Sequence, residues 1–377
     1  MNYYSRNSRN RCPSQSSRSI TRATRRTEPQ IQDSSIEIID IIMIDSTSAD
    51  CCVFAKESLS VEGYMASPPA VHQRTNSQLK DHKEFLKKSK DSLLSRSVKE
   101  LSLLQFHEVE PHLQSNPYIT SGYRASLSTK MCIESAFWLT NETINIWSHV
   151  FGWMLFFGLT IYDLLLLNIH ASPFDKLVVG LLLGCFQISM ASSTMYHTFS
   201  CKSEKHFNCF LSFDLFGIAL SLLGIYLSGI YYAFWCHPVH RMFYLSTVFF
   251  IFVTVIGLQL PKLKASDNLK MISFVCWAAY GVIPTCHWVI IMGGWENPIV
   301  AKLLSRILNM YLISGLAFLI YVTRMPERFF KGKLDYIGSS HQWWHFLVVI
   351  ALYYWHNTGI LYIEYRMNHG CVNDLRL

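Results

Sequence analysis

The last apolar run of the chain opens with Ser339-Ser340-His341-Gln342-Trp343-Trp344-His345 and continues to Ile363. His341 and His345 are four residues apart, so in a helix they lie on one face, about one turn from each other. This spacing allows a single helix to supply two ligands to a metal ion. Because a polar pair at membrane depth is costly, the pattern indicates a functional site where a membrane-spanning helix begins.

Six further apolar runs precede this one. The chain has 377 residues and is 50% hydrophobic, and its apolar residues cluster after Ile144 instead of being spread along the chain. A run of about 20 apolar residues is long enough to cross the hydrocarbon core as a helix. We expect spans at residues 144–169, 177–199, 210–235, 241–260, 269–293, 307–323 and 341–363. The sequence therefore predicts an all-α membrane protein with seven transmembrane helices, of which the fourth and sixth are the shortest.

Charge in the connecting loops predicts the orientation of the bundle. Nine lysines and arginines lie in the loops on the N-terminal side, against four in the loops on the other side. Cytosolic loops are enriched in these residues, so we expect a cytosolic N-terminus and an outer or lumenal C-terminus. The formal net charge of +7 is modest and suits a membrane surface, and we expect no nucleic-acid partner.

This orientation brings four polar residues to the same depth in the cytosolic half of the membrane. His197 ends the second span, Asp214 begins the third, and His341 and His345 begin the seventh. Three histidines and one open position are typical of a catalytic zinc site, so we assign His197, His341 and His345 as metal ligands. Asp214 is a candidate to bind the metal or hold its water and move a proton. Ser193, one turn before His197, is a candidate to stabilise an oxyanion during attack on a lipid amide.

Three other histidines in the spans have a simpler interpretation. His149, His287 and His356 each lack a spaced partner at their own depth, so we expect them to be hydrogen-bonded within the bundle and not metal-bound. Asp163, near the outer end of the first span, is expected to extend its carboxylate toward the membrane surface. Pro284 is expected to kink the fifth span.

The eleven cysteines are scattered and form no CxxC pair, which argues against a disulfide framework and a cysteine zinc cluster. Cys236 and Cys371 are both placed on the outer side by the predicted topology. One bridge between these two residues is therefore compatible with the sequence.

The chain divides into four regions by composition. We expect a disordered, basic and serine-rich cytosolic tail (1–110), a cytosolic juxtamembrane segment (111–143), the transmembrane domain (144–363) and a short outer or lumenal tail (364–377). Within the juxtamembrane segment, residues 116–118 indicate a turn and residues 131–143 a short amphipathic helix.

Three stretches of the tail have open alternatives. Residues 1–26 fit either a disordered basic arm or a transit peptide. The β-branched residues 36–44 fit either a strand that pairs with a partner's sheet or an apolar patch in a disordered tail. Residues 78–106 fit either a basic amphipathic helix on an anionic membrane or a solvated charged segment.

A family resemblance becomes clear from the motifs taken together. Residues 141–149 (Asn-Glu-Thr-Ile-Asn-Ile-Trp-Ser-His) and 193–197 (Ser-Thr-Met-Tyr-His), followed by Asp214 and the His341/His345 pair, resemble the motifs of the progestin and adipoQ receptor family in their usual order. The resemblance covers about residues 115–370. It implies a seven-helix fold with a cytosolic N-terminus, a zinc ion held by three histidines, and a cavity that accommodates lipid. It also implies a link to ceramide hydrolysis, as in adiponectin receptors.

Within this family, residues 116–119, 280–284 and 322–328 are most similar to a member regarded as a Golgi membrane protein that tethers Raf kinase and restrains its signalling. The resemblance implies a signalling receptor or regulator in the Golgi membrane, with the plasma membrane as the alternative location. Its implied partners are membrane lipids, a ceramide or other lipid ligand, and a Raf-like kinase bound through the N-terminal region. The alternative function is a zinc-dependent, ceramidase-like hydrolase.

Overall fold

The computed structural model describes residues 84, 87–88, 102–166, 172–260 and 263–371. The predictions made for residues 1–26 and 36–44, and for most of residues 78–106, lie outside the described residues.

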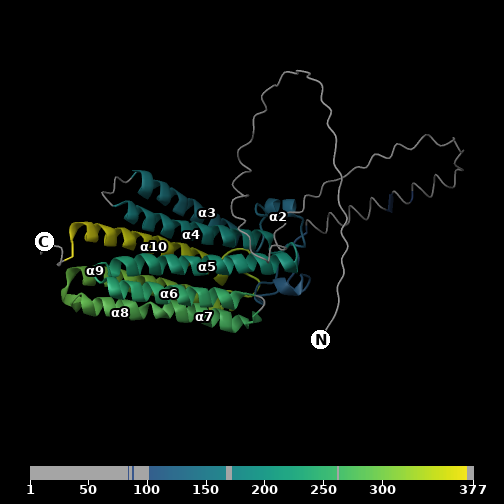
Figure 1. The fold of residues 1–377 in the computed structure, drawn as a ribbon. Coiled ribbons are helices and arrows are strands. Elements are labelled where there is room, and N and C mark those ends of the chain that lie inside the picture. Colours follow the sequence, from purple (N-terminus) through teal and green to yellow (C-terminus); the bar gives the residue numbers. More distant parts are fainter. Residues whose placement is uncertain (1–83, 85–86, 89–101, 167–171, 261–262, 372–377) are drawn as a thin grey trace, which may run out of the picture. The chain divides into compact units, whose positions relative to one another are not determined.

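Seven helices are long and apolar enough to cross a membrane, which confirms the predicted bundle (Figure 1). The first span is α3 (Thr143–Ile161), extended by one π-helical turn, η4 (Tyr162–Leu166). The others are α4 (Pro173–Phe199), α5 (Glu204–Ala233), α6 (Pro238–Gln259), the pair α7 (Asp267–Tyr280) and α8 (Val282–Ile291), α9 (Pro298–Thr323) and α10 (Ser340–Asn368). Three short elements complete the described part: η3 (Pro111–Leu113), α2 (Thr129–Ser135) and η6 (Gly294–Glu296).

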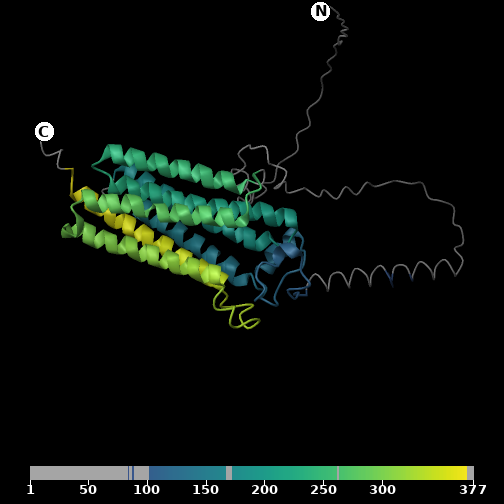
Figure 2. The same ribbon diagram turned by 90° about the horizontal axis from the view of Figure 1, so that it is seen from below.

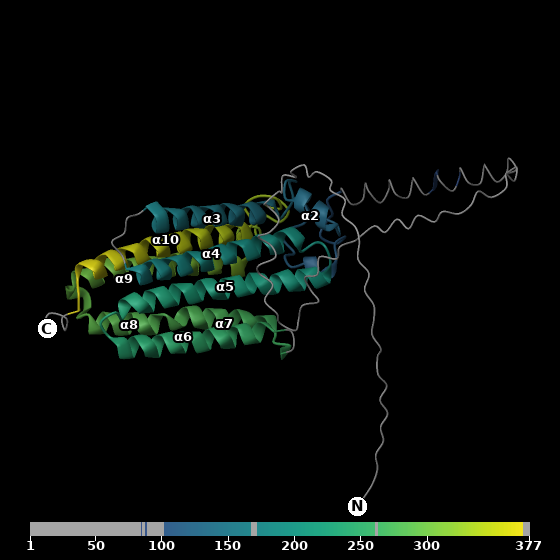
Figure 3. The same ribbon diagram turned by 45° about the horizontal axis from the view of Figure 1, so that its top comes forward.

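The last helix lies in the middle of the half of the bundle that is formed by α3, α4, α5 and α9. Helix α10 contacts α3, α4, α5 and α9, whereas α6 and α7 lie on the far side of α5 (Figures 2 and 3). The start of α10 therefore meets the start of α3 and the end of α4. The short helix α2 packs against α4 at this same end.

Two glycines allow α4 and α5 to approach closely. A Cβ atom on Gly217 would lie 2.8 Å from the backbone Cα of Ser189, and one on Gly224 would lie 3.2 Å from the Cβ of Cys185. In a membrane, helices gain no hydrophobic driving force from one another, so close backbone contact through small residues supplies much of their attraction. This contact fixes the position of α4.

The sixth span is longer than the sequence indicated, and the prediction that it is among the shortest is wrong. Helix α9 begins at Pro298 and is capped by Asn297, whose side chain accepts a hydrogen bond from the backbone of Ile299. The sequence analysis missed this first part of the helix because the charged Arg306 interrupts the apolar run. In the structure its guanidinium donates to Thr358 on α10 at 3.1 Å and lies 4.9 Å from the Tyr354 ring centroid.

The fifth span is interrupted where a proline was expected to kink it. Helix α7 ends at Tyr280 and α8 begins at Val282, with Pro284 in its first turn. Proline has no N–H to donate to the carbonyl of Tyr280, and its ring clashes with that carbonyl. The helix is therefore interrupted at Gly281, three residues before Pro284, while the predicted kink stays a prediction.

The juxtamembrane segment folds differently from the predicted 131–143 helix. Helix α2 spans Thr129–Ser135, and the chain then turns before α3 begins. The Thr143 hydroxyl accepts from the backbone of Thr140 at 2.8 Å and donates to the carbonyl of Trp138 at 2.5 Å. These side-chain bonds compete with a continuous helix, as threonine often does near helix ends. The turn at residues 116–118 is confirmed, because Asn116 Oδ1 accepts from the backbone N–H of Tyr118.

A disulfide joins the α5–α6 connection to the chain that follows α10. It links Cys236 to Cys371 across a Cα–Cα distance of 5.6 Å, so the bridge that the sequence allowed is present. It lies at the end of the bundle where α10 finishes, away from α2 and the start of α10 (Figure 1).

Candidate metal centre

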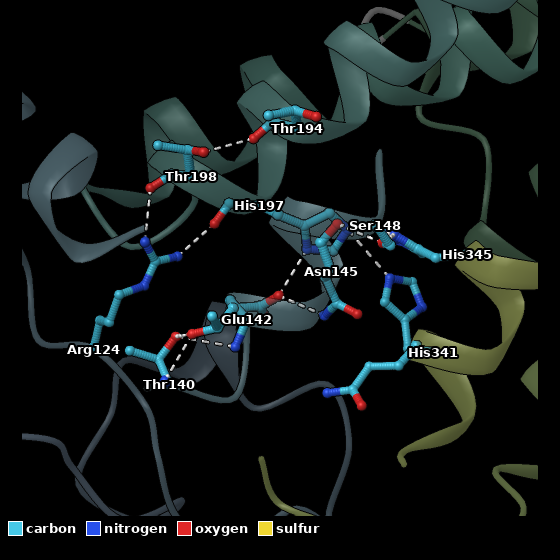
Figure 4. A network of polar contacts seen from close by, with 12 residues as sticks. Arg124, Thr140, Glu142, Asn145, Ser148, Thr194, His197, Thr198, His341 and His345 are labelled. Atoms are coloured by element: carbon cyan, nitrogen blue, oxygen red, sulfur yellow. Dashed lines mark hydrogen bonds and ion pairs between the residues drawn. The ribbon is translucent and has the colours of Figure 1, made fainter. Parts of the chain in front are cut away.

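Three imidazoles converge at the end of the bundle where α10 starts (Figure 4). His197 comes from the last turn of α4, and His341 and His345 come from the first two turns of α10. One ring nitrogen from each residue lies within 4.8 Å of the others, and the Nε2 atoms of His197 and His341 are 3.3 Å apart. His197 and His345 are each only 2% exposed. In the described part of the chain, these three residues form the group that can hold a metal ion.

Helix α3 orients two of these rings through their other nitrogen. The Nδ1 of His345 lies 3.1 Å from the backbone carbonyl of Asn145 and 3.1 Å from the Ser148 hydroxyl. A carbonyl can only accept, so His345 carries its proton on Nδ1 and keeps the Nε2 lone pair free. The Nδ1 of His197 lies 2.7 Å from a carboxylate oxygen of Glu142, which gives the same result. Metal-binding histidines show this arrangement, so the residues present fit a metal ion.

Glu142, at the N-cap of α3, is a functional residue that the sequence reasoning did not single out. Its burial favours the neutral acid, but His197, Asn145 and Arg124 outweigh this effect and lower the pKa of Glu142 to about 2. Asn145 donates from its side chain to the same carboxylate at 2.7 Å. The only sequence signal was its place inside the 141–149 stretch, because nothing in the spacing pairs Glu142 with a histidine 55 residues away.

Arg124 fixes the end of α4, which carries His197. The buried guanidinium donates to the Ser135 hydroxyl at 2.9 Å, to the carbonyl of Thr198 at 2.9 Å and to the carbonyl of His197 at 2.5 Å. The last carbonyls of a helix have no partner within the helix, so a cation there supplies both hydrogen bonds and a favourable interaction with the helix dipole. No motif in the sequence identified this residue.

Two buried carboxylates hold the start of α10. Glu327 accepts from the backbone N–H of Ser340 at 2.7 Å, from the Ser340 hydroxyl, and from the Asn116 side chain at 3.0 Å. Asp335 accepts from Thr120 at 2.9 Å and from the Ser121 hydroxyl at 2.7 Å. The juxtamembrane segment and the α9–α10 loop are thereby joined beside His341.

The two candidate catalytic residues lie next to the histidines. Ser193 is buried on α4 one turn before His197, and it lies close enough to Asp214 on α5 to interact with its carboxylate. Asp214 also lies close enough to His197 to interact electrostatically with it. Its carboxylate is not one of the converging ligand atoms, so the structure favours a role beside the centre over direct coordination. The catalytic roles of Ser193 and Asp214 stay predictions.

The remaining histidines have different surroundings. His287 pairs with the Tyr244 hydroxyl at 2.8 Å, as expected for a hydrogen-bonded residue. His356 lies 2.5 Å from Asp163, and both side chains are buried, so the expectation that Asp163 extends toward the membrane surface is wrong. A carboxylate with an imidazole partner within reach has no need of water. His149 has no hydrogen-bond partner and stacks on His345 instead.

The class of protein follows from a seven-helix membrane bundle with a buried three-histidine cluster at one end. The family model described as "Haemolysin-III related" matches residues 137–356, and the chain belongs to this haemolysin III and progestin and adipoQ receptor family. The chain is 43% identical to human "Progestin and adipoQ receptor family member 3" over 277 residues, which cover 72% of this chain and 89% of the relative. It is 33% identical to the Drosophila melanogaster "Adiponectin receptor protein" over 252 residues, covering 66% and 56% of the two chains. The predicted resemblance is confirmed.

Replacing Arg124 with alanine tests how firmly the end of α4 is held. The Arg124→Ala variant leaves two buried carbonyls without a partner, and each costs about 1–3 kcal/mol, so we expect a clear fall in the melting temperature of the purified protein. Arg328→Ala, at an exposed position of the α9–α10 loop, is the control and should melt like the parent. Equal melting temperatures for all three proteins would show that Arg124 does not stabilise this end.

Proposed function

We propose that this protein is a signalling receptor or regulator of its family whose inner end holds a zinc ion between His197, His341 and His345. The observation that carries the proposal is the paired orientation of His197 and His345, whose Nδ1 atoms face Glu142 and the Asn145 carbonyl. Three imidazoles whose ring nitrogens converge on one point are a donor set that suits zinc. A cluster held only by packing has no need of these oriented partners.

The same centre supports a second function, hydrolysis of a lipid amide such as a ceramide. A bound zinc ion supplies a Lewis acid that activates water near neutral pH. In this function Asp214 would accept a proton from that water on its carboxylate, and the Ser193 hydroxyl would donate to the oxygen of the attacked carbonyl. The specific observation in favour of this function is that Asp214 lies close enough to both Ser193 and His197 to interact with them.

A cavity in the other half of the bundle supports a lipid as the ligand. Its volume is about 130 Å³. It lies between α5, α8, α9 and α10, and its lining is mainly apolar and aromatic, with Trp288, Trp355 and Tyr362 among the lining residues. An apolar space of this kind inside a membrane bundle suits part of an acyl chain.

Metal analysis followed by a lipid-hydrolysis assay tests both functions. Purified protein should contain about one zinc per chain, and Glu142→Gln should weaken zinc binding by about 10–100-fold in competition with a chelator, because one ring loses its orienting partner. Glu134→Gln, on the exposed face of α2, is the matched control. Asp214→Ala should keep zinc and lose ceramide hydrolysis.

The two functions fail in different ways. Parent protein that holds no zinc would refute the metal centre and the chemistry that depends on it. Zinc-loaded protein that hydrolyses no ceramide, under conditions in which a known ceramidase works, would refute the hydrolase alone. A structural zinc would then remain, and His341→Ala should lower the melting temperature.

We further propose that the N-terminus is cytosolic and that the metal centre lies near the inner leaflet of the Golgi membrane. The excess of lysine and arginine in the loops at the metal-centre end supports this orientation. The Cys236–Cys371 disulfide at the opposite end supports it independently, because such bonds persist in oxidising compartments.

Protease protection of tagged ends tests the orientation. In sealed microsomes, whose cytosolic face is outside, a tag at the N-terminus should be digested, and a tag at the C-terminus should survive until detergent is added. Cutting at the C-terminus without detergent, or protection of the N-terminus, would reverse the topology.

We also propose that the N-terminal region tethers a Raf-like kinase, which rests on similarity to one relative. In cells, deletion of residues 1–110 should release the kinase from the membrane, whereas His197→Ala should not, because it alters only the metal centre. If recruitment survives this deletion and also survives substitutions in residues 115–143, the tether does not exist.

A further inference from the structure

Helix α3 presents two neighbouring polar side chains to the histidine cluster. Asn145 and His149 are one turn apart on the same face, and each is 4% exposed. The His149 ring lies flat against His345, with 3.8 Å between the ring centroids and 12° between the planes. Stacking accounts for the position of this ring, but not for its being an imidazole.

Three atoms of these two side chains have no hydrogen-bond partner. They are Nδ1 and Nε2 of His149 and Oδ1 of Asn145, all fully buried within the described part of the chain. Burying such groups unpaired is costly, and in native proteins each case calls for an explanation such as a held water, an ion or a catalytic role. Two residues with this property, one turn apart beside the same cluster, point to a single missing partner.

The neighbouring buried groups show the contrast. The Nδ1 atoms of His197 and His345 each have a hydrogen-bond partner, and the other half of the Asn145 amide donates to Glu142. The available polar groups at these sites are therefore used. Beside the histidine cluster the unpaired buried atoms belong to Asn145 and His149, and the other described side chains with such an atom are His112, Gln259, Trp277, Trp288 and His356.

We propose that Asn145 and His149 form a polar subsite that holds a neutral hydroxyl or amide group, either of a water molecule or of a bound lipid. The Asn145 oxygen can only accept, which disfavours an anion and requires a donor. A neutral imidazole offers one donor and one acceptor, so a group that both donates and accepts satisfies the remaining atoms. The subsite deepens the proposed function, because it lies beside the same three histidines, and it rests on that function only for the lipid source.

A near-isosteric pair of variants tests the subsite without any metal. His149→Gln keeps a polar group and His149→Leu removes it, while both lose the stacked ring equally. In chelator-treated, full-length protein in detergent, an occupied subsite should make the Gln variant melt about 2–4 °C above the Leu variant. A dry, empty site gives the reverse order, because the amide would be buried unpaired, and this outcome overturns the proposal. Leu183→Gln, in the apolar core of α4, is the control and should melt well below the parent.

The source of the group is then identified with lipid probes. N-hexanoylsphingosine carries an amide and hydroxyls, whereas methyl octadecanoate carries acceptor oxygens but no donor. If the subsite holds lipid, the first probe should raise the melting temperature of the parent and the Gln variant but not of the Leu variant, and the second should raise none. If neither probe distinguishes the variants while the Gln variant still melts above the Leu variant, the occupant is water. Absence of zinc or of hydrolase activity would refute the proposed function and leave this comparison intact.

Discussion

Three helix ends must be held at one depth for the imidazoles to meet, and hydrogen bonds from α3, Arg124 and Glu327 hold these ends. Helix α3 orients His345 and His197 through Asn145 and Glu142, so the first span positions ligands that it does not supply. Arg124 holds the end of α4, where the helix would otherwise leave buried carbonyls unpaired. In hydrocarbon no water replaces a lost partner, which is why the arrangement depends on hydrogen bonds made entirely within the protein.

Two pairs of polar side chains elsewhere in the spans also bond within the protein. Asp163 and His356 pair with each other between the end of the first span and α10, and His287 pairs with Tyr244. The disulfide closes the opposite end of the bundle, where the chain meets an oxidising compartment in the proposed orientation. The bundle thus has one end closed by a disulfide and another end, with the three histidines, held by hydrogen bonds.

Sequence reasoning correctly predicted the features of this protein that depend on local sequence patterns. Seven apolar runs and the four-residue spacing of His341 and His345 predicted the bundle, and loop charge placed His197 at their depth. Sequence reasoning failed where a feature depends on contacts between side chains that are far apart in the chain. The charge of Arg306 concealed the first turns of α9 because its partners lie on α10. Glu142 and Arg124 were missed because their partners are far away in the chain, and no spacing rule relates them.

The start of α10 is joined by hydrogen bonds to the juxtamembrane segment. Asn116 and Ser340 share the carboxylate of Glu327, and Ser340 directly precedes His341. Because Glu327 is fully buried, it cannot exchange one partner for water, and moving Asn116 leaves an oxygen unpaired beside the metal centre. A protein bound to the juxtamembrane segment therefore acts on the same hydrogen bonds that set the position of His341. This physical connection is what the proposed signalling role requires of the fold, since it gives the juxtamembrane segment and the histidine cluster one shared element whose position both can bias.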